Sequence, residues 1–314
     1  MLRYSLNRLG QALIVLWAAF TASFILLQVM PGDAALLKFL NPEYGLNAQQ
    51  IEELRGRYGF DEPVFLQYLK SLSNFLHGDL GFSIQAGVPV TEQLVVNLPP
   101  TLQLAGFAFL AAIILAFLLT LLSSFSPFAW LKNLFLSLPS LFLAVPLFWI
   151  GIIMVQVFSF ELGWISVIAP GPIEGLILPI ATLAIPISAP MAQILMRAMD
   201  EIETRPFIMV LQAKGASKWR IFWQHGLRNA ALPTLTVAGL LFGELISGAV
   251  VTETVFGLSG IGKMTEQAVR SQDVTVLQAI VVISALAFVT INLLIDLSFP
   301  FIDPRLKKSK GKAA

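Results

Sequence analysis

Long uncharged windows divide the chain into six predicted membrane-spanning helices. About 20 apolar helical residues cross the hydrocarbon core of a bilayer, and six windows of this kind run near residues 9–30, 101–123, 131–158, 175–196, 230–251 and 274–295. The third window carries Pro139 and Pro146, which we expect to bend it because proline cannot continue the helical hydrogen bonding. The pattern predicts an all-α, polytopic membrane protein.

Two connections between these windows are longer than a simple turn requires. Residues 31–99 carry helical patterns of their own: Asn47 and Gln50 resemble a capping box, and a second amphipathic face begins at Phe65. We expect a small helical external region, which either covers the helix ends or docks an external partner. The predicted parts are then the N-terminus with the first span (1–30), this region (31–99), a five-helix core (100–303) and a basic tail (304–314).

The second long connection covers residues 197–229, between the fourth and fifth spans. Apolar residues recur at 207, 210 and 211 and again at 219, 222 and 223, so two short helical segments are predicted to meet at Gly215. Trp219 and Trp223 follow this glycine. They either anchor the segment at the lipid interface or place a helix in a groove of a cytoplasmic partner.

The placement of basic residues predicts the orientation of the chain. An even number of spans puts both termini on one side, and fourteen of the 20 Lys and Arg residues lie on that side. Cytoplasmic loops carry the excess of Lys and Arg in membrane proteins. Both termini and residues 197–229 are therefore predicted to be cytoplasmic.

Composition excludes several classes of function. The chain is 56% hydrophobic and 12% charged with a net charge of +1, which argues against a nucleic-acid binder. Its mean hydropathy is +0.78, as expected for a chain dissolved in a bilayer. It contains no cysteine, so disulfides and thiolate chemistry are excluded, and two histidines are too few for a histidine-rich metal cluster. The first apolar run exceeds the core of a signal peptide, so we expect a retained helix.

One acidic residue, Glu244, lies inside the predicted fifth span beside Gly243. Ionisable groups at this depth are costly and usually face an interior or an aqueous path. Glu244 either bonds to a neighbouring helix or, with Gly243 and Gly248, lines a translocation path. In the second case a cationic or amine-bearing substrate is favoured. Gly239 and Gly243 form a small-xxx-small pair that lets another helix approach closely.

Residues 257–263 fit the start of a phosphate-binding loop, GxxxxGK. That motif needs a preceding strand and a Ser or Thr after the lysine, whereas a membrane helix precedes it here and Met264 follows it. A glycine-rich turn between the fifth and sixth spans is predicted instead, so ATP hydrolysis is expected in another chain.

Several segments carry a family resemblance. Ala213-Lys214-Gly215, Ile221 and the run from His225 to Ala230 resemble the EAA loop of ABC importer permeases of the dipeptide, oligopeptide and nickel group. Matching segments in the expected order cover almost the whole chain: Met1–Tyr4, Pro31–Asp33, Tyr58–Pro63, Gln67–Tyr68, His77–Gly81, Leu98–Leu102, Pro146–Trp149, Leu162–Trp164, Leu178–Pro179, Glu253–Phe256, Gly260–Gly262 and Asp303–Arg305.

The resemblance implies an assembly of two homologous permeases, two cytoplasmic ATPases and an external solute-binding protein in a bacterial inner membrane. Within it, the loop would act as the coupling helix through Ala213, Lys214, Gly215, Ala216, Ser217, Trp219 and Ile221. No catalytic residue, metal or cofactor is expected in this chain, since ATP and Mg²⁺ would bind the partner subunits. A short peptide, nickel or a metal chelate, or another small polar solute would cross by alternating access.

Two other classes of function are alternatives to the importer permease. A stand-alone secondary transporter or channel would predict an internal repeat with broken helices at matching positions, and the sequence shows no convincing repeat. An intramembrane enzyme would need a nucleophile with its base, or a metal site, which Glu244 does not provide by itself.

Overall fold

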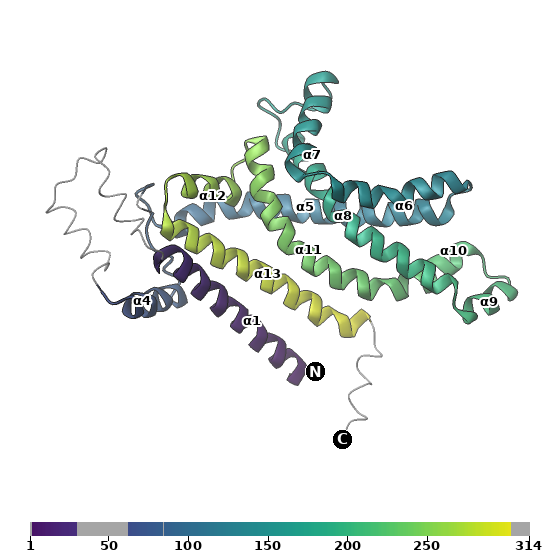
Figure 1. Ribbon diagram of the computed structural model, residues 1–314, viewed down its shortest axis with the longest axis horizontal. Coiled ribbons are helices and arrows are strands. Elements are labelled where there is room, and N and C mark those ends of the chain that lie inside the picture. The colour runs from purple at the N-terminus through teal and green to yellow at the C-terminus, as the bar shows by residue number, and fades with distance from the viewer. Residues whose placement is uncertain (1, 30–61, 84, 303–314) are drawn as a thin grey trace. The chain divides into compact units, whose positions relative to one another are not determined.

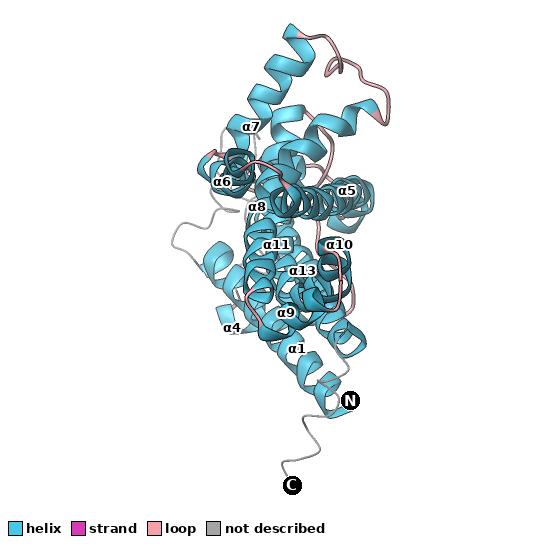
Figure 2. Cartoon of the chain, turned by 90° about the vertical axis from the view of Figure 1, so that its right-hand side faces the viewer, coloured by secondary structure: helices cyan, strands magenta, loops and turns pink. Residues whose placement is uncertain are grey.

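The computed structural model describes residues 2–29, 62–83 and 85–302 (Figure 1). In these ranges the regular elements are helices, as Figure 2 shows, and Phe82 and Pro89 form one isolated antiparallel bridge. Labelled α for α-helices and η for π-helical turns, the elements are α1 (Leu2–Phe24), η1 (Ile25–Val29), α4 (Val64–Leu76), α5 (Val90–Phe125), α6 (Ala129–Ala144), α7 (Leu147–Met154), η3 (Val155–Glu161), α8 (Glu174–Glu203), α9 (Pro206–Ala213), α10 (Lys218–Ile221), η4 (Phe222–Gly226), α11 (Leu227–Phe256), α12 (Ile261–Arg270) and α13 (Val274–Ile302).

Five of the described helices are long and apolar enough to cross a membrane, and a sixth span results if one bent pair counts as a single crossing. In that pair, α6 and the α7–η3 helix meet at an angle of 104°. The break falls at Pro146, which precedes the first residue of α7, because its ring prevents the helix from continuing. The all-α polytopic fold predicted from the sequence is confirmed, and so is the bend at Pro146. Pro139, which was also expected to bend the span, lies inside the uninterrupted helix α6.

Some helices are longer than the sequence predicted, either at their start or at their end. α5 begins at Val90 rather than near residue 101, and it contains Pro99 and Pro100. α11 continues to Phe256 rather than ending near residue 251. A hydrophobic window ends where polar residues, prolines or charges begin, such as Asn97 and Pro99 before the second window or Glu253 after the fifth. A helix continues through such residues as long as its backbone bonds are made. α12 was not predicted, because ten amphipathic residues are too few to stand out as a span.

The chain forms two compact units. One contains Leu6–Pro100 with Ser259–Thr290, and the other contains Thr101–Leu258 with Met1–Ser5 and Ile291–Ala314. The predicted helix near residues 47–58 and the basic tail of residues 304–314 lie outside the described residues. The amphipathic face predicted from Phe65 onward corresponds to α4.

In the first of these units, α4 packs against α1 through aromatic side chains. The rings of Phe20 and Phe75 meet edge to face at 5.1 Å between centroids, and Phe24 meets Tyr68 in the same way at 5.3 Å. The Tyr68 hydroxyl also lies 2.9 Å from that of Thr21. These contacts fix α4 on the first span.

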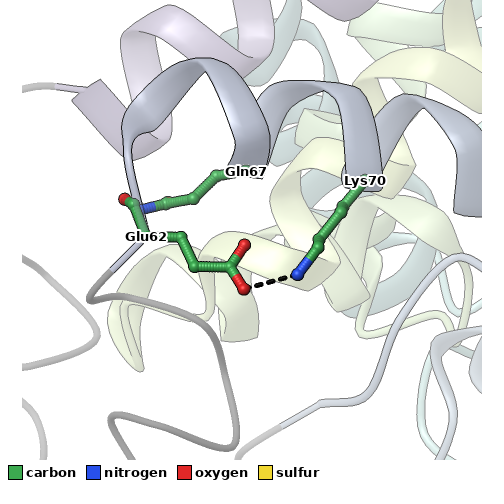
Figure 3. Close-up of polar contacts among 3 residues, drawn as sticks. All are labelled: Glu62, Gln67 and Lys70. Atoms are coloured by element: carbon green, nitrogen blue, oxygen red, sulfur yellow. Dashed lines mark hydrogen bonds and ion pairs between the residues drawn. The ribbon is translucent and has the colours of Figure 1, made fainter.

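The start of α4 is held by polar contacts, shown in Figure 3. Lys70 forms an ion pair with Glu62, and the Gln67 side-chain amide donates to the Glu62 backbone carbonyl at 2.8 Å. Because both charged side chains are partly exposed, the ion pair adds little stability. Its effect is to orient the chain as it enters the helix at Pro63.

A second polar contact in the same unit joins residues 190 positions apart. Ser83 donates to the Asp273 carboxylate at 2.6 Å, and both side chains are buried. The other carboxylate oxygen of Asp273 accepts from the Val276 backbone N–H in the first turn of α13, as an N-cap residue does. Asp273 therefore starts α13 and fastens the loop before α5 to it.

In the other unit, α8 is the central helix. It packs against both α5 and α11 in a core that contains Leu183, Met191 and Leu245. α8 includes Pro179, Pro186 and Pro190, which neighbouring helices make tolerable inside a membrane protein. α11 also approaches α13 closely, because a methyl group at Gly239 would lie 3.0 Å from Asn292 Oδ1.

Candidate functional site

Residues 206–226, which we call the connecting segment, join α8 to α11 at one end of the unit that contains both helices (Figure 1). α9 starts with Pro206 at its first position, where a missing N–H costs nothing. It ends in a Schellman motif: Gly215 N–H donates to the Gln212 carbonyl and Ala216 N–H to the Leu211 carbonyl. Gly215 has φ +83°, a left-handed conformation that glycine adopts without strain.

Ser217 precedes α10, the second helix of the connecting segment. Its side chain accepts a hydrogen bond from the Arg220 backbone N–H, so it is an N-cap of the preferred type. α10 then passes into the π-helical turn η4. The sequence prediction of two short helices meeting at Gly215 is confirmed.

An aromatic cluster attaches the connecting segment to the end of α5. The ring centroid of Phe125 lies 5.4 Å from those of both Trp219 and Phe222. The ring centroid of Phe117 lies 5.4 Å from that of Trp223. Trp219 and Trp223 also contact each other at 5.6 Å. Tilted and edge-to-face pairs of this kind each stabilise by about 0.5–1.5 kcal/mol beyond area burial. We call these five residues the aromatic cluster.

Further contacts attach the same segment to α8. Ile202, Ile208 and Ile221 form a small buried core between the end of α8 and the two short helices. At Gly226, an added methyl group would lie 2.6 Å from Met199 Sδ, so the π-helical turn and α8 approach closely there. The connecting segment is therefore packed against both α5 and α8.

The residues predicted for coupling divide into an exposed group and a buried one. Ala213, Lys214, Gly215, Ser217 and Trp219 are exposed, Ala216 is half-buried, and Ile221 is buried. Trp219 keeps 54% of its surface exposed despite its ring contacts. The exposed group forms a surface at the tip of the segment, whereas Ile221 holds that tip on its own chain.

The residues predicted for a translocation path lie close together on α11 but differ in exposure. Glu244 is exposed and lies near the middle of the Pro233–Phe256 span. Gly243 is half-buried. Gly248 is buried, because a methyl group there would meet Leu183 Cδ2 at 2.9 Å and Leu147 Cδ2 at 3.1 Å. Gly248 therefore serves helix packing, and only Glu244 faces out of the chain.

The sequence analysis did not predict that a second carboxylate of α11, that of Glu253, is buried. Glu253 is 1% exposed and accepts a hydrogen bond from the Thr101 hydroxyl of α5 at 2.6 Å. Burial of a carboxylate requires such a partner. The signal for it was present, because extending the fifth helix by one turn would have brought Glu253 inside the span.

The segment that fits GxxxxGK lies between two helices. α11 precedes it and ends at Gly257, which has φ +66°, and α12 begins at Ile261. Met264 is buried in α12. A helix stands where a phosphate-binding loop requires a strand, so the segment is a turn, as the sequence analysis predicted.

The fold and the connecting segment together define a class of protein: a multi-pass membrane subunit that carries a two-helix projection between two packed spans. Solved ABC transporters have the same fold. A chain of the MetNI methionine ABC transporter, in an inward-facing conformation, matches 68% of this chain and 97% of its own length with a TM-score of 0.57 and 18% identity. A chain of an amino acid ABC transporter matches 66% of this chain and 92% of its own length, with a TM-score of 0.52 and 17% identity.

The family follows from the sequence comparisons. Residues 108–308 match the family described as binding-protein-dependent transport system inner membrane component, and residues 1–105 match the N-terminal family of such membrane components. The chain belongs to this family and is the inner-membrane permease component of an ABC importer. The resemblance drawn from the sequence is confirmed.

Curated relatives extend over nearly the whole chain. The glutathione transport system permease protein GsiC of Escherichia coli is 31% identical over 307 residues, which cover 98% of this chain and 99% of the relative. A putative peptide transport system permease protein of Brucella abortus is 32% identical over 310 residues, or 96% and 98% of the two chains. These relatives are permease subunits rather than enzymes, so this multi-pass chain works in a bacterial inner membrane with ATPase and binding-protein partners.

Proposed function

We propose that this chain forms half of the translocation pathway of an ATP-driven importer of short peptides. The observation that carries the proposal is the connecting segment, which exposes Trp219 at its tip while the aromatic cluster and Ile221 attach it to α5 and α8. The peptide substrate is supported by the names of relatives that match along their whole length, for glutathione and for peptides.

The exposed surface of the connecting segment is the proposed contact with an ATPase. An amphipathic helix that inserts into a groove on a partner is a common mode of recognition, and exposed Trp side chains often dominate the binding energy of such contacts. Lys214 and Ser217 lie on either side of the Gly215 turn and add polar groups at its edge. In this proposal Trp219 docks on a partner and does not simply anchor the segment at the lipid interface.

The proposed assembly contains this chain, a second homologous permease, two cytoplasmic ATPases that bind ATP and Mg²⁺, and an external binding protein. The excess of Lys and Arg on the side of both termini supports a cytoplasmic location for them. Closure of the ATPases moves the connecting segments, and the permease pair shifts between inward-facing and outward-facing states. ATP drives this shift only through its different affinity for the two states.

The experiment compares two exposed tryptophans. Trp219 and Trp130 are 54% and 67% exposed, but Trp130 lies at the start of α6 outside the connecting segment. Tagged wild-type chain, Trp219→Ala and Trp130→Ala are purified in mild detergent with co-expressed partner subunits. ATPase activity is then measured with the binding protein and alanyl-alanine present.

Wild type and Trp130→Ala are expected to retain the ATPases and their stimulation by alanyl-alanine, whereas Trp219→Ala loses one or both. Equal behaviour of the two variants would assign Trp219 to lipid anchoring. Transport of the dipeptide by wild-type chain purified without any ATPase would overturn the importer proposal.

A further inference from the structure

One face of α11 is exposed along the whole membrane span. Its residues recur at intervals of three or four, so they form a single stripe on the helix, and we call them the α11 stripe: Pro233, Thr236, Leu240, Glu244, Ser247, Val251 and Thr254. Four of these seven side chains are polar or charged. The stripe therefore differs in composition from an ordinary lipid-facing surface.

An exposed face of α5 in the same unit provides the comparison. Leu110, Ile114 and Leu118 follow one another at intervals of four and are all exposed. Each is apolar, as expected for a surface that lipid tails cover. Glu244, near the middle of its own span, is a carboxylate. Ionisable groups inside a membrane almost always face the bundle interior or water.

The opposite face of α11 already has its packing partners within the chain. Leu241, Phe242 and Leu245 are buried in the core with α8, and Gly248 fits beneath Leu183. The α11 stripe is thus turned away from the core of its own unit. Among the residues that the structure describes, none forms an ion pair or hydrogen bond with Glu244. Within the span, Pro233–Phe256, no Lys, Arg or His is present.

We propose that the α11 stripe lines an aqueous path between this chain and the second permease, and that Glu244 binds a cationic group of the solute as it crosses. This inference rests on the proposed function. Glu244 supplies a negative charge halfway along the path, and the hydroxyl oxygens of Ser247 and Thr254 supply hydrogen-bond acceptors on the same face. The Thr254 hydroxyl hydrogen is already donated to the Val250 carbonyl. A protonated amine or a metal cation has the required charge. An uncharged or anionic group at the same place gains nothing from the carboxylate.

The first test uses the absence of cysteine from the natural sequence. Ser247→Cys and Ile114→Cys each introduce a single thiol, one on the α11 stripe and one on the apolar face of α5. In proteoliposomes that contain the complete transporter, both variants are treated with a charged methanethiosulfonate reagent. Modification at Ser247→Cys is expected to be about a hundredfold faster, because a charged reagent is strongly excluded from the bilayer centre. Equal, slow modification at both positions would overturn the aqueous path.

The second test measures the charge of Glu244 through its neighbour. Residue 247 lies one turn from residue 244 on the same face. A cationic reagent should therefore modify Ser247→Cys faster than an anionic reagent of the same size, after correction for their rates with 2-mercaptoethanol. Adding Glu244→Gln should bring the corrected ratio close to one, while Glu244→Asp should preserve it. A ratio that Glu244→Gln leaves unchanged would overturn the cation site.

The third test distinguishes the two sources of positive charge. Alanyl-alanine, N-acetyl-alanyl-alanine and NiCl₂ are each added before the thiol reagent. Protection of Ser247→Cys by alanyl-alanine but not by its acetylated form assigns the site to an ammonium group, and protection by NiCl₂ assigns it to a metal cation. Both results support a cation site, whereas protection by none of the three contradicts it.

The same proteoliposomes separate failure of this inference from failure of the proposed function. If the binding protein and dipeptide stimulate the ATPases but Ser247→Cys remains unreactive, the importer stands and the stripe is a dry contact with the second permease. If no stimulation is obtained from the cysteine-free chain, the proposed function itself fails.

Discussion

The glycine at the tip of the connecting segment allows a test in which only backbone conformation changes. Gly215 has φ +83°, and a methyl group built on it would meet no other atom within 4 Å. Gly215→Ala therefore creates no steric clash with another side chain. Its effect comes from the left-handed conformation itself, which costs an L-residue roughly 1–2 kcal/mol.

That free energy sets the size of the expected effect. A cost of 1–2 kcal/mol changes the population of the native turn by a factor of about 5 to 30. Because the Schellman motif positions α10 relative to α9, coupled transport of alanyl-alanine should fall by up to the same factor. Gly215→Asn should retain most of the activity, since asparagine enters the left-handed region more readily than other residues with a Cβ.

The measurement is the rate of dipeptide uptake, with its associated ATPase stimulation, in proteoliposomes that contain the complete transporter. Gly106→Ala is the control: Gly106 is also exposed with no atom within 4 Å of an added methyl, but it lies inside α5 and its φ is not positive. Alanine favours a helix interior, so uptake by Gly106→Ala should match wild type. Equal uptake by the alanine and asparagine variants at position 215 would refute the role of backbone conformation.

Two further predictions concern stability of the purified chain in detergent, measured by thermal denaturation. Thr101→Val should lower the free energy of unfolding by about 1–3 kcal/mol, since it removes a hydrogen-bond donor from buried Glu253. The control Thr120→Val should lower it little, because the Thr120 hydroxyl donates only to a carbonyl four residues earlier in its own helix. Gly248→Leu should destabilise by about 1–3 kcal/mol through overpacking, while Gly106→Leu should leave the denaturation temperature unchanged. Equal shifts within either pair would contradict the packing described.

The spans could be predicted from the sequence because the bilayer requires a fixed length of uncharged helix. The two helices of the connecting segment were also predictable, since Gly215 interrupts a regular apolar spacing. The position of the break in the third span followed from Pro146, but its 104° angle did not. The angle depends on tertiary packing, which no local rule encodes.

Residue type alone did not indicate which leucines of α11 face the core. Leu240 is exposed and Leu241 is buried, although the two have the same side chain. Only the position of α8 distinguishes them. For the same reason the sequence indicated Glu244 as an unusual charge without showing that it faces outward, and it gave Gly248 the same expected role although Gly248 packs inward.

The contact between Ser83 and Asp273 also sets an order of events during synthesis. Its two residues are 190 positions apart, so at about 5–20 residues per second the ribosome adds Asp273 roughly 10–40 s after Ser83. Throughout that interval the loop before α5 has no Asp273 to bind, although the spans from α5 to α11 are already being made. The loop can take its final form only when the last span enters the membrane, which makes closure of this contact a late step in the biogenesis of the permease.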